Sequence, residues 1–124
     1  MLRKLAFIAG ILALLGTAAP TFAQKTGPNG GSVLGKGDHQ IELVVSPTEL
    51  AVYMLSDGNP HDSKGVTLRA VVQQGGKNTT INFVDDKGKR LVAKLPAPLD
   101  KGAVVVLTGK DDHGDPLNAR HVIK

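Results

Sequence analysis

The 124-residue sequence contains no cysteine and no tryptophan, and its aromatic residues are one Tyr and three Phe. The absence of cysteine excludes a disulfide framework, a zinc-thiolate site, an iron–sulfur cluster and a thiol nucleophile. Nucleic-acid binders usually concentrate basic residues and interleave aromatics, whereas here 15 Lys and Arg are scattered among 11 Asp and Glu. Nucleic acid is therefore not an expected partner.

The sequence also lacks the short motifs of common enzyme classes. It has no Gly-x-Ser-x-Gly, no His-Glu-x-x-His, no phosphate-binding glycine loop and no dinucleotide fingerprint. The acidic loop Asp111-Asp112-His113-Gly114-Asp115 superficially suggests calcium, but the twelfth position counted from Asp111 is Val122, where an EF-hand requires Glu. We therefore expect a protein that is not an enzyme.

No apolar run is long enough to span a bilayer, but the N-terminus has the pattern of an export signal. Arg3 and Lys4 precede an almost unbroken apolar run over residues 5–15, and residues 16–23 are small and polar, ending at Ala23. This three-part pattern is typical of a secretory signal, and its apolar run is far shorter than the ~20 residues of a membrane span. We expect cleavage after Ala23 and a periplasmic or secreted product without stable membrane insertion.

After the signal, short runs rich in Val, Ile, Leu and Thr alternate with Gly, Pro, Asn and Asp, as in antiparallel all-β domains. The two glycines of Gln74-Gly75-Gly76-Lys77 predict a tight hairpin turn between strands at 66–73 and 78–84, and residues 85–89 predict another turn. The number of these runs and the spacing of the turns between them predict an immunoglobulin-like antiparallel β-sandwich of about seven to eight strands, with a small closed barrel as the alternative.

We expect three segments: a signal peptide at 1–23, a flexible lead-in at 24–31 and a β-sandwich domain at 32–124. The glycines and proline of the lead-in are equally compatible with a loop against the sandwich edge. The expected core is aliphatic and comprises Ile41, Leu43, Leu50, Val52, Leu68, Val72, Ile81, Phe83, Leu91, Leu95, Val104 and Val106.

The histidines are the residues best suited to a binding site, because imidazole is the commonest protein ligand of Zn²⁺ and Cu²⁺ and no thiol competes. Since a sandwich gathers its loops at two ends, two of His39, His61 and His113 could meet a carboxylate on one ion. Four exposed histidines unrelated in space are the alternative, and His121 on the last strand is expected to be half exposed. Met54 is either a core residue or a soft ligand for Cu(I).

The stretch Gly27-Pro28-Asn29-Gly30-Gly31-Ser32-Val33-Leu34, followed by Gly37-Asp38-His39-Gln40-Ile41-Glu42-Leu43-Val44, resembles the opening of small exported β-sandwich modules associated with heavy-metal RND efflux systems. Residues 50–55 and the turn Asp57-Gly58-Asn59-Pro60 resemble the strand and turn that follow in that family. The matching positions are Gly30, Gly31, His39 and Glu42, whereas Asn29 stands where the family often has His. The resemblance implies a Gram-negative periplasm and a metal-binding or adaptor-partner role.

Residues and resemblance together predict a periplasmic, non-enzymatic metal-binding or accessory protein of a heavy-metal efflux or homeostasis system. The expected ligands are His39, Glu42, His61 and His113, the expected ion is Cu or Zn, and the expected partner is a periplasmic efflux adaptor or another envelope protein.

The alternative function is a metal-independent protein-interaction module of the cell envelope, which binds through a sheet edge or through loops. An exposed apolar patch of Ala51, Tyr53 and Leu55 would favour this alternative, and burial of the three side chains is the other interpretation.

Overall fold

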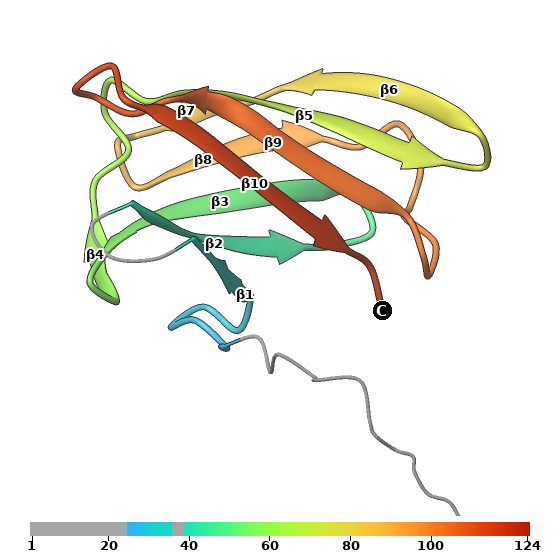
Figure 1. Cartoon of the computed structure of the whole chain (residues 1–124), viewed down its shortest axis with the longest axis horizontal. Helices are drawn as coiled ribbons and strands as arrows, with labels where there is room; N and C mark the ends of the chain where they lie inside the picture. The colour runs from blue at the N-terminus through green and yellow to red at the C-terminus, as the bar shows by residue number, and fades with distance from the viewer. Residues whose placement is uncertain (1–24, 36–38) are drawn as a thin grey trace, which may run out of the picture.

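The computed structural model describes residues 25–35 and 39–124, which form ten β-strands in two antiparallel sheets (Figure 1). The expected signal peptide at 1–23 lies outside the described residues. The first sheet has the order β1-β2-β3-β8-β7, with β4 paired to β3, and comprises β1 (Ser32–Leu34), β2 (Gln40–Val45), β3 (Glu49–Ser56), β4 (Asn59–His61), β7 (Val84–Asp86) and β8 (Arg90–Lys94). The second sheet has the order β10-β9-β5-β6 and comprises β5 (Thr67–Gln74), β6 (Lys77–Asn82), β9 (Val104–Lys110) and β10 (Pro116–Val122).

The all-β sandwich predicted from the sequence is confirmed, with ten strands instead of seven or eight. One additional strand arises because the run at 78–84 is divided at Phe83: β6 pairs with β5, and β7 continues into the other sheet beside β8. The turn expected at 85–89 is correspondingly shorter, since Asp85 and Asp86 belong to β7. The other additional strand is β4, which pairs with the end of β3. No helix within the described part of the chain is long and apolar enough to cross a membrane.

The hairpin predicted at residues 74–77 is confirmed. Gln74 and Lys77 are partners in the β5–β6 ladder, and Gly75 and Gly76 between them have φ values of 59° and 77°. Two successive positive φ angles define a turn whose twist matches that of the flanking strands, and glycine adopts them without strain.

The core lies between the sheets and is aliphatic, as expected, but the prediction for β9 was wrong by one residue. Val105 and Leu107 are buried at 0% and 1% exposure, whereas Val104 and Val106 are only partly buried. Because residues 104–107 are all apolar, alternation could not indicate which set faces inward. Ile81, Phe83 and Leu95 are partly buried against the core. Met54 is a core residue, which was one of its two interpretations, and the core residues not expected from the sequence are Leu34, Val66, Ala70 and Leu117.

Residues 25–31, in the expected lead-in, form a turn against the first sheet. The main-chain N–H of Gly27 donates to the carbonyl of Gly31, and the turn lies over the Glu42 carboxylate, which accepts hydrogen bonds from Asn29 and Gly31. A Cβ atom at Gly27 would collide with this carboxyl group, so the close approach requires glycine.

Candidate metal site

A pocket of about 420 Å³ lies at the end of the sandwich where β9 turns into β10. Three of the histidines predicted from the sequence line it, namely His39, His61 and His113. The other polar side chains in its lining include Asp111, Asp112 and Asp115. Residues from both sheets therefore meet at this pocket.

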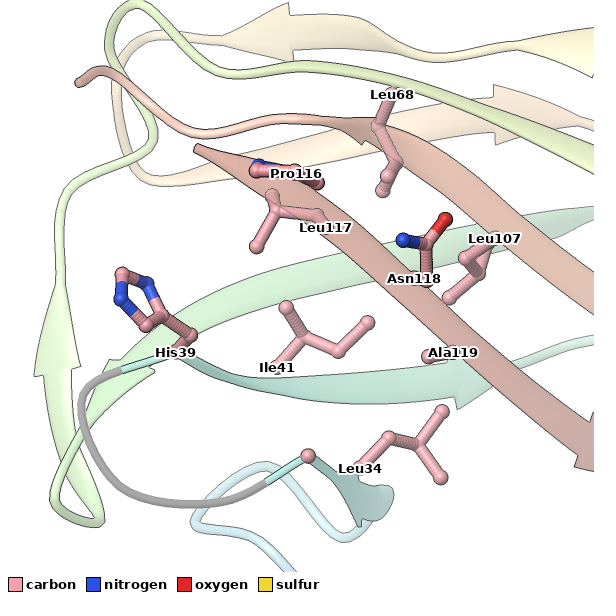
Figure 2. Close-up of a pocket in the computed structure, with 10 residues that line it drawn as sticks. Leu34, His39, Ile41, Leu68, Leu107, Pro116, Leu117, Asn118 and Ala119 are labelled. Atoms are coloured by element: carbon pink, nitrogen blue, oxygen red, sulfur yellow. The ribbon is translucent and has the colours of Figure 1, made fainter. Parts of the chain in front are cut away.

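Strand register places the histidines of the first sheet. Met54 on β3 is the Cα partner of both Ile41 on β2 and His61 on β4, so these three side chains project from the same face. His39 precedes Ile41 by two residues and continues that face, which is the face turned toward the second sheet. Figure 2 shows His39 at the start of β2, in a close-up that also contains Pro116 and Leu117 of β10.

The second sheet contributes its carboxylates through the loop at 111–115. Asp111 is 6% exposed, and its Oδ1 accepts hydrogen bonds from the main-chain N–H groups of His113 (2.9 Å) and Asp115 (2.8 Å). Its own N–H donates to the Asp115 carbonyl. This bonding folds the loop around the Asp111 carboxylate and leaves the side chains of His113 and Asp115 exposed at the pocket.

His39 and Asp111 connect the two sheets. The Nδ1 atom of His39 lies 3.2 Å from Oδ2 of Asp111. Burial alone would raise the pKa of Asp111, but the two main-chain N–H donors and the neighbouring His39 and His113 outweigh it and lower this pKa below the usual 3.8. Asp111 is therefore ionised at neutral pH and holds the Nδ1 side of the His39 ring.

His39, Asp111 and Asp115 form a group that could hold a metal ion, because each offers a ligand atom and these atoms lie within 4.8 Å of one another. His39 and Asp115 are exposed, so rotation of their side chains can bring the ligand atoms to the distance of about 2.1 Å that Zn²⁺ requires.

His61 and His113 line the same pocket, but they lie outside this close group. The Nδ1 atom of His61 is 2.9 Å from the carbonyl oxygen of Asp62, so a proton on Nδ1 leaves Nε2 as the unprotonated nitrogen. The Nε2 atom of His113 is 3.8 Å from a carboxylate oxygen of Asp112, and the His113 side chain is 77% exposed. Both rings can approach the pocket by side-chain rotation.

The structure places Glu42 and His121 away from this group. Glu42 has no exposed surface and projects from the opposite face of β2, where its carboxylate is occupied by Asn29 and Gly31. His121 lies near the other end of β10, opposite Val105. At 9% exposure His121 is buried rather than half exposed, and this burial lowers its pKa from 6.5.

Asp111 and Asp115 are the members of the group that sequence reasoning missed. The available signal was the density of carboxylates around His113, because these oxygen ligands lie beside an imidazole even though their spacing does not match an EF-hand. The contact with His39 spans more than 70 positions of the chain, and only the packing of the two sheets creates it.

No family model matches the chain, and no curated protein or solved structure shows significant similarity to it.

Proposed function

We propose that this protein is a periplasmic, non-enzymatic metal-binding or accessory protein of a heavy-metal efflux or homeostasis system. It binds a divalent transition metal, Zn²⁺ or Cu²⁺, in the pocket at the end of the sandwich. The single observation that carries the proposal is the convergence of His39, Asp111 and Asp115, with two further histidines lining the same pocket.

The proposed ligands are His39 and Asp115, and Asp111 is a ligand or orients His39. Metal-binding histidines usually donate their second ring N–H to a carboxylate, which fixes the ring and increases its basicity. The pair of His39 Nδ1 and Asp111 Oδ2 provides this arrangement, with Nε2 of His39 left for the ion. The Asp62 carbonyl can accept a hydrogen bond from Nδ1 of His61 in the same way, and His61 completes the set of metal ligands when its ring turns into the pocket.

The mixture of imidazole and carboxylate donors determines the class of ion. Imidazole suits Zn, Cu and Ni, whereas Mg and Ca prefer a shell made only of oxygen. Met54 also lines the pocket, but it is 7% exposed and belongs to the hydrophobic core, so it is not among the proposed ligands. Glu42, an expected ligand, has no part in this proposal because its carboxylate accepts three hydrogen bonds elsewhere.

The proposed compartment rests on the N-terminal export pattern, and the proposed efflux setting rests on the resemblance carried by Gly30, Gly31 and His39. A periplasmic efflux adaptor is the natural recipient for a metal held in an open pocket of this kind. Histidine and carboxylate ligands of an exposed site exchange their ion with solvent or with a partner.

The test is a calorimetric titration of the chain from Gln24 onward with Zn²⁺, Cu²⁺ and Ni²⁺ at pH 7.5. We expect one ion per chain for at least one of these metals. His39→Gln and Asp115→Asn should each weaken binding by tenfold or more, about 1.4 kcal/mol. The matched control is Asp100→Asn, which removes one carboxylate outside the pocket lining.

Binding that Asp100→Asn and Asp115→Asn weaken equally would indicate a nonspecific attraction of cations and would contradict the proposed site. Absence of binding by all three metals would contradict the function itself. The alternative, a metal-independent interaction module, gains no support from the patch considered in the sequence, because Ala51 and Leu55 are buried at 4% and 2% exposure.

A further inference from the structure

Among the ten described strands, β10 forms one edge of the second sheet and pairs only with β9. Two main-chain hydrogen bonds flank the ladder between β9 and β10: the N–H of Asp111 donates to the carbonyl of Asp115, and the N–H of Ile123 donates to the carbonyl of Ala103. Residues 115 and 123 therefore bond toward β9, and so do the odd-numbered residues of β10 between them. Because bonding alternates along an antiparallel ladder, the main-chain N–H and C=O groups of Asn118, Arg120 and Val122 point away from the sheet. Within the described residues, no hydrogen bond occupies these groups.

A pocket of about 200 Å³ lies below this edge, between β10 and the start of the first sheet (Figure 2), and its lining is mostly aliphatic but includes His39 and Asn118. Leu34, Ile41 and Leu107 line it together with Leu117 and Ala119 of β10. A cavity of about 150 Å³ can hold benzene, so this pocket has room for a branched aliphatic side chain.

The solvent face of the second sheet is positively charged. Strands β5, β6, β9 and β10 contain no Asp or Glu. On this face they carry Arg69, Lys110 and Arg120, and all three residues are exposed. Acidic residues in strands of the described chain all belong to the first sheet. A strand beside β10 would therefore have apolar surroundings on its inner face and cationic surroundings on its outer face.

We propose that β10 is a docking edge for an extended segment of a partner protein whose side chains alternate between apolar and acidic. The segment adds as a fifth strand to the second sheet and bonds to the outward main-chain groups of Asn118, Arg120 and Val122. Its apolar side chains enter the pocket beneath β10, and its acidic side chains lie over the face that carries Arg120. This docking edge goes beyond the proposed function, and its pocket adjoins the proposed metal site because His39 lines both.

Charge also argues against a second copy of this chain as the occupant. Pairing of two β10 strands would bring Arg120 of each copy onto the same outer face, and cations on an edge strand oppose such self-pairing. An acidic segment instead gains attraction at the same position.

The test uses an eight-residue peptide of alternating Val and Glu, titrated into the metal-free chain from Gln24 onward, which contains every described strand. Amide chemical shifts measured by NMR should change along β10 and around Leu34 and Ile41. A peptide of alternating Val and Lys should leave them unchanged. Metal-free protein keeps the result independent of the ion, so failure of the metal proposal and failure of this one are distinguishable.

Two variants locate the binding. Asn118→Pro removes one outward N–H at an edge position where proline is tolerated, and it should weaken peptide binding by roughly tenfold or more. Arg120→Glu should weaken it roughly fivefold or more, whereas Lys77→Glu, the same charge change at the β5–β6 turn, should have little effect. Thermal melts of each variant establish that it is folded.

Shift changes that are confined to β10 and the surroundings of Leu34 and Ile41, and that Asn118→Pro abolishes, would support the proposal. Absence of shifts at millimolar peptide, or binding unaffected by both β10 variants, would overturn it. Concentration-dependent dimerisation in sedimentation that Asn118→Pro abolishes would also overturn it, because the occupant would then be a second copy.

Discussion

The carboxylate of Glu42 accepts two hydrogen bonds from Asn29, one from its main-chain N–H at 2.9 Å and one from its side-chain Nδ2 at 3.0 Å. The N–H of Gly31 adds a third bond at 2.8 Å. Glu42 has no exposed surface, so the turn at 27–31 shields the carboxylate and also satisfies it. Asn29, where the resembling family often has His, therefore has a structural partner in this protein.

Substitution of Glu42 should destabilise the fold more than substitution of an exposed glutamate. Glu42→Gln removes the charge and replaces one of the two acceptor oxygens with an amide N–H₂ beside the donors of Asn29 and Gly31, which should cost about 1–3 kcal/mol. The matched control is Glu49→Gln, which removes a partly exposed partner 3.5 Å from Arg90 and should cost less than about 1 kcal/mol. Urea unfolding measures both free energies, and equal losses would contradict the role assigned to Glu42.

The inward-facing residues of β9 can be tested with two identical truncations. Val105→Ala should lower the free energy of unfolding by about 1.5–3 kcal/mol, because Val105 is fully buried between the sheets. Val106→Ala, on the solvent face, should cost less than about 1 kcal/mol. The reverse order in urea unfolding would show that the strand presents its other face to the core.

His121 should make stability depend on pH near neutrality. Burial of its ring, followed by repulsion from Lys124, lowers its pKa below 6.5 in the folded chain. The unfolded chain then binds more protons as the pH falls below 6.5, so stability is full above 6.5 and is lost toward the lower folded pKa. The loss can reach at most about 1.4 kcal/mol per pH unit. Unfolding measured from pH 8 to pH 5 should show a smaller decline for His121→Phe, and parallel curves would refute this assignment.

Asp85 and Asp111 should contribute to loss of stability in acid. A hydrogen bond from Ser63 and another from the Gly88 N–H lower the pKa of Asp85. Burial would raise the pKa of Asp111, but hydrogen bonds from the loop N–H groups outweigh this effect and lower it. Both groups favour the folded state above pH 3.8, and this contribution disappears as the pH falls through their folded pKa values. Asp85→Asn and Asp111→Asn should each flatten the decline of the unfolding free energy between pH 5 and pH 2.5. A slope unchanged from the unsubstituted chain would count against these hydrogen bonds.

Metal binding should stabilise the folded chain, because the ligand atoms converge only after the sheets pack. At a free ion concentration 100 times the dissociation constant, the free energy of unfolding should rise by about 2.7 kcal/mol. Addition of EDTA should reverse the gain, and His39→Gln should show a much smaller one. Thermal melts with and without Zn²⁺ or Cu²⁺ provide the measurement, and an equal gain in His39→Gln would exclude His39 as a ligand.

The sequence by itself determined the fold class and the positions of most strands. The mostly apolar runs at 41–45 and 50–55 and glycine turns such as Gly75-Gly76 are local features, and local backbone preferences suffice to interpret them. The division of the run at 78–84 between two sheets and the inward face of 104–107 were not predictable, because neither depends on local pattern. They are decided by which strand lies alongside and which side chains fill the space between the sheets.

The same contrast applies to the candidate metal site. His39, His61 and His113 are suitable ligands by residue type, and the sequence identified them on that ground. Tertiary structure alone brought His39 to Asp111 and Asp115, and it assigned Glu42 to the turn at 27–31. The physical reason is that the ligands come from residues remote in sequence. The distances between them are fixed only when the two sheets bury their apolar faces against each other.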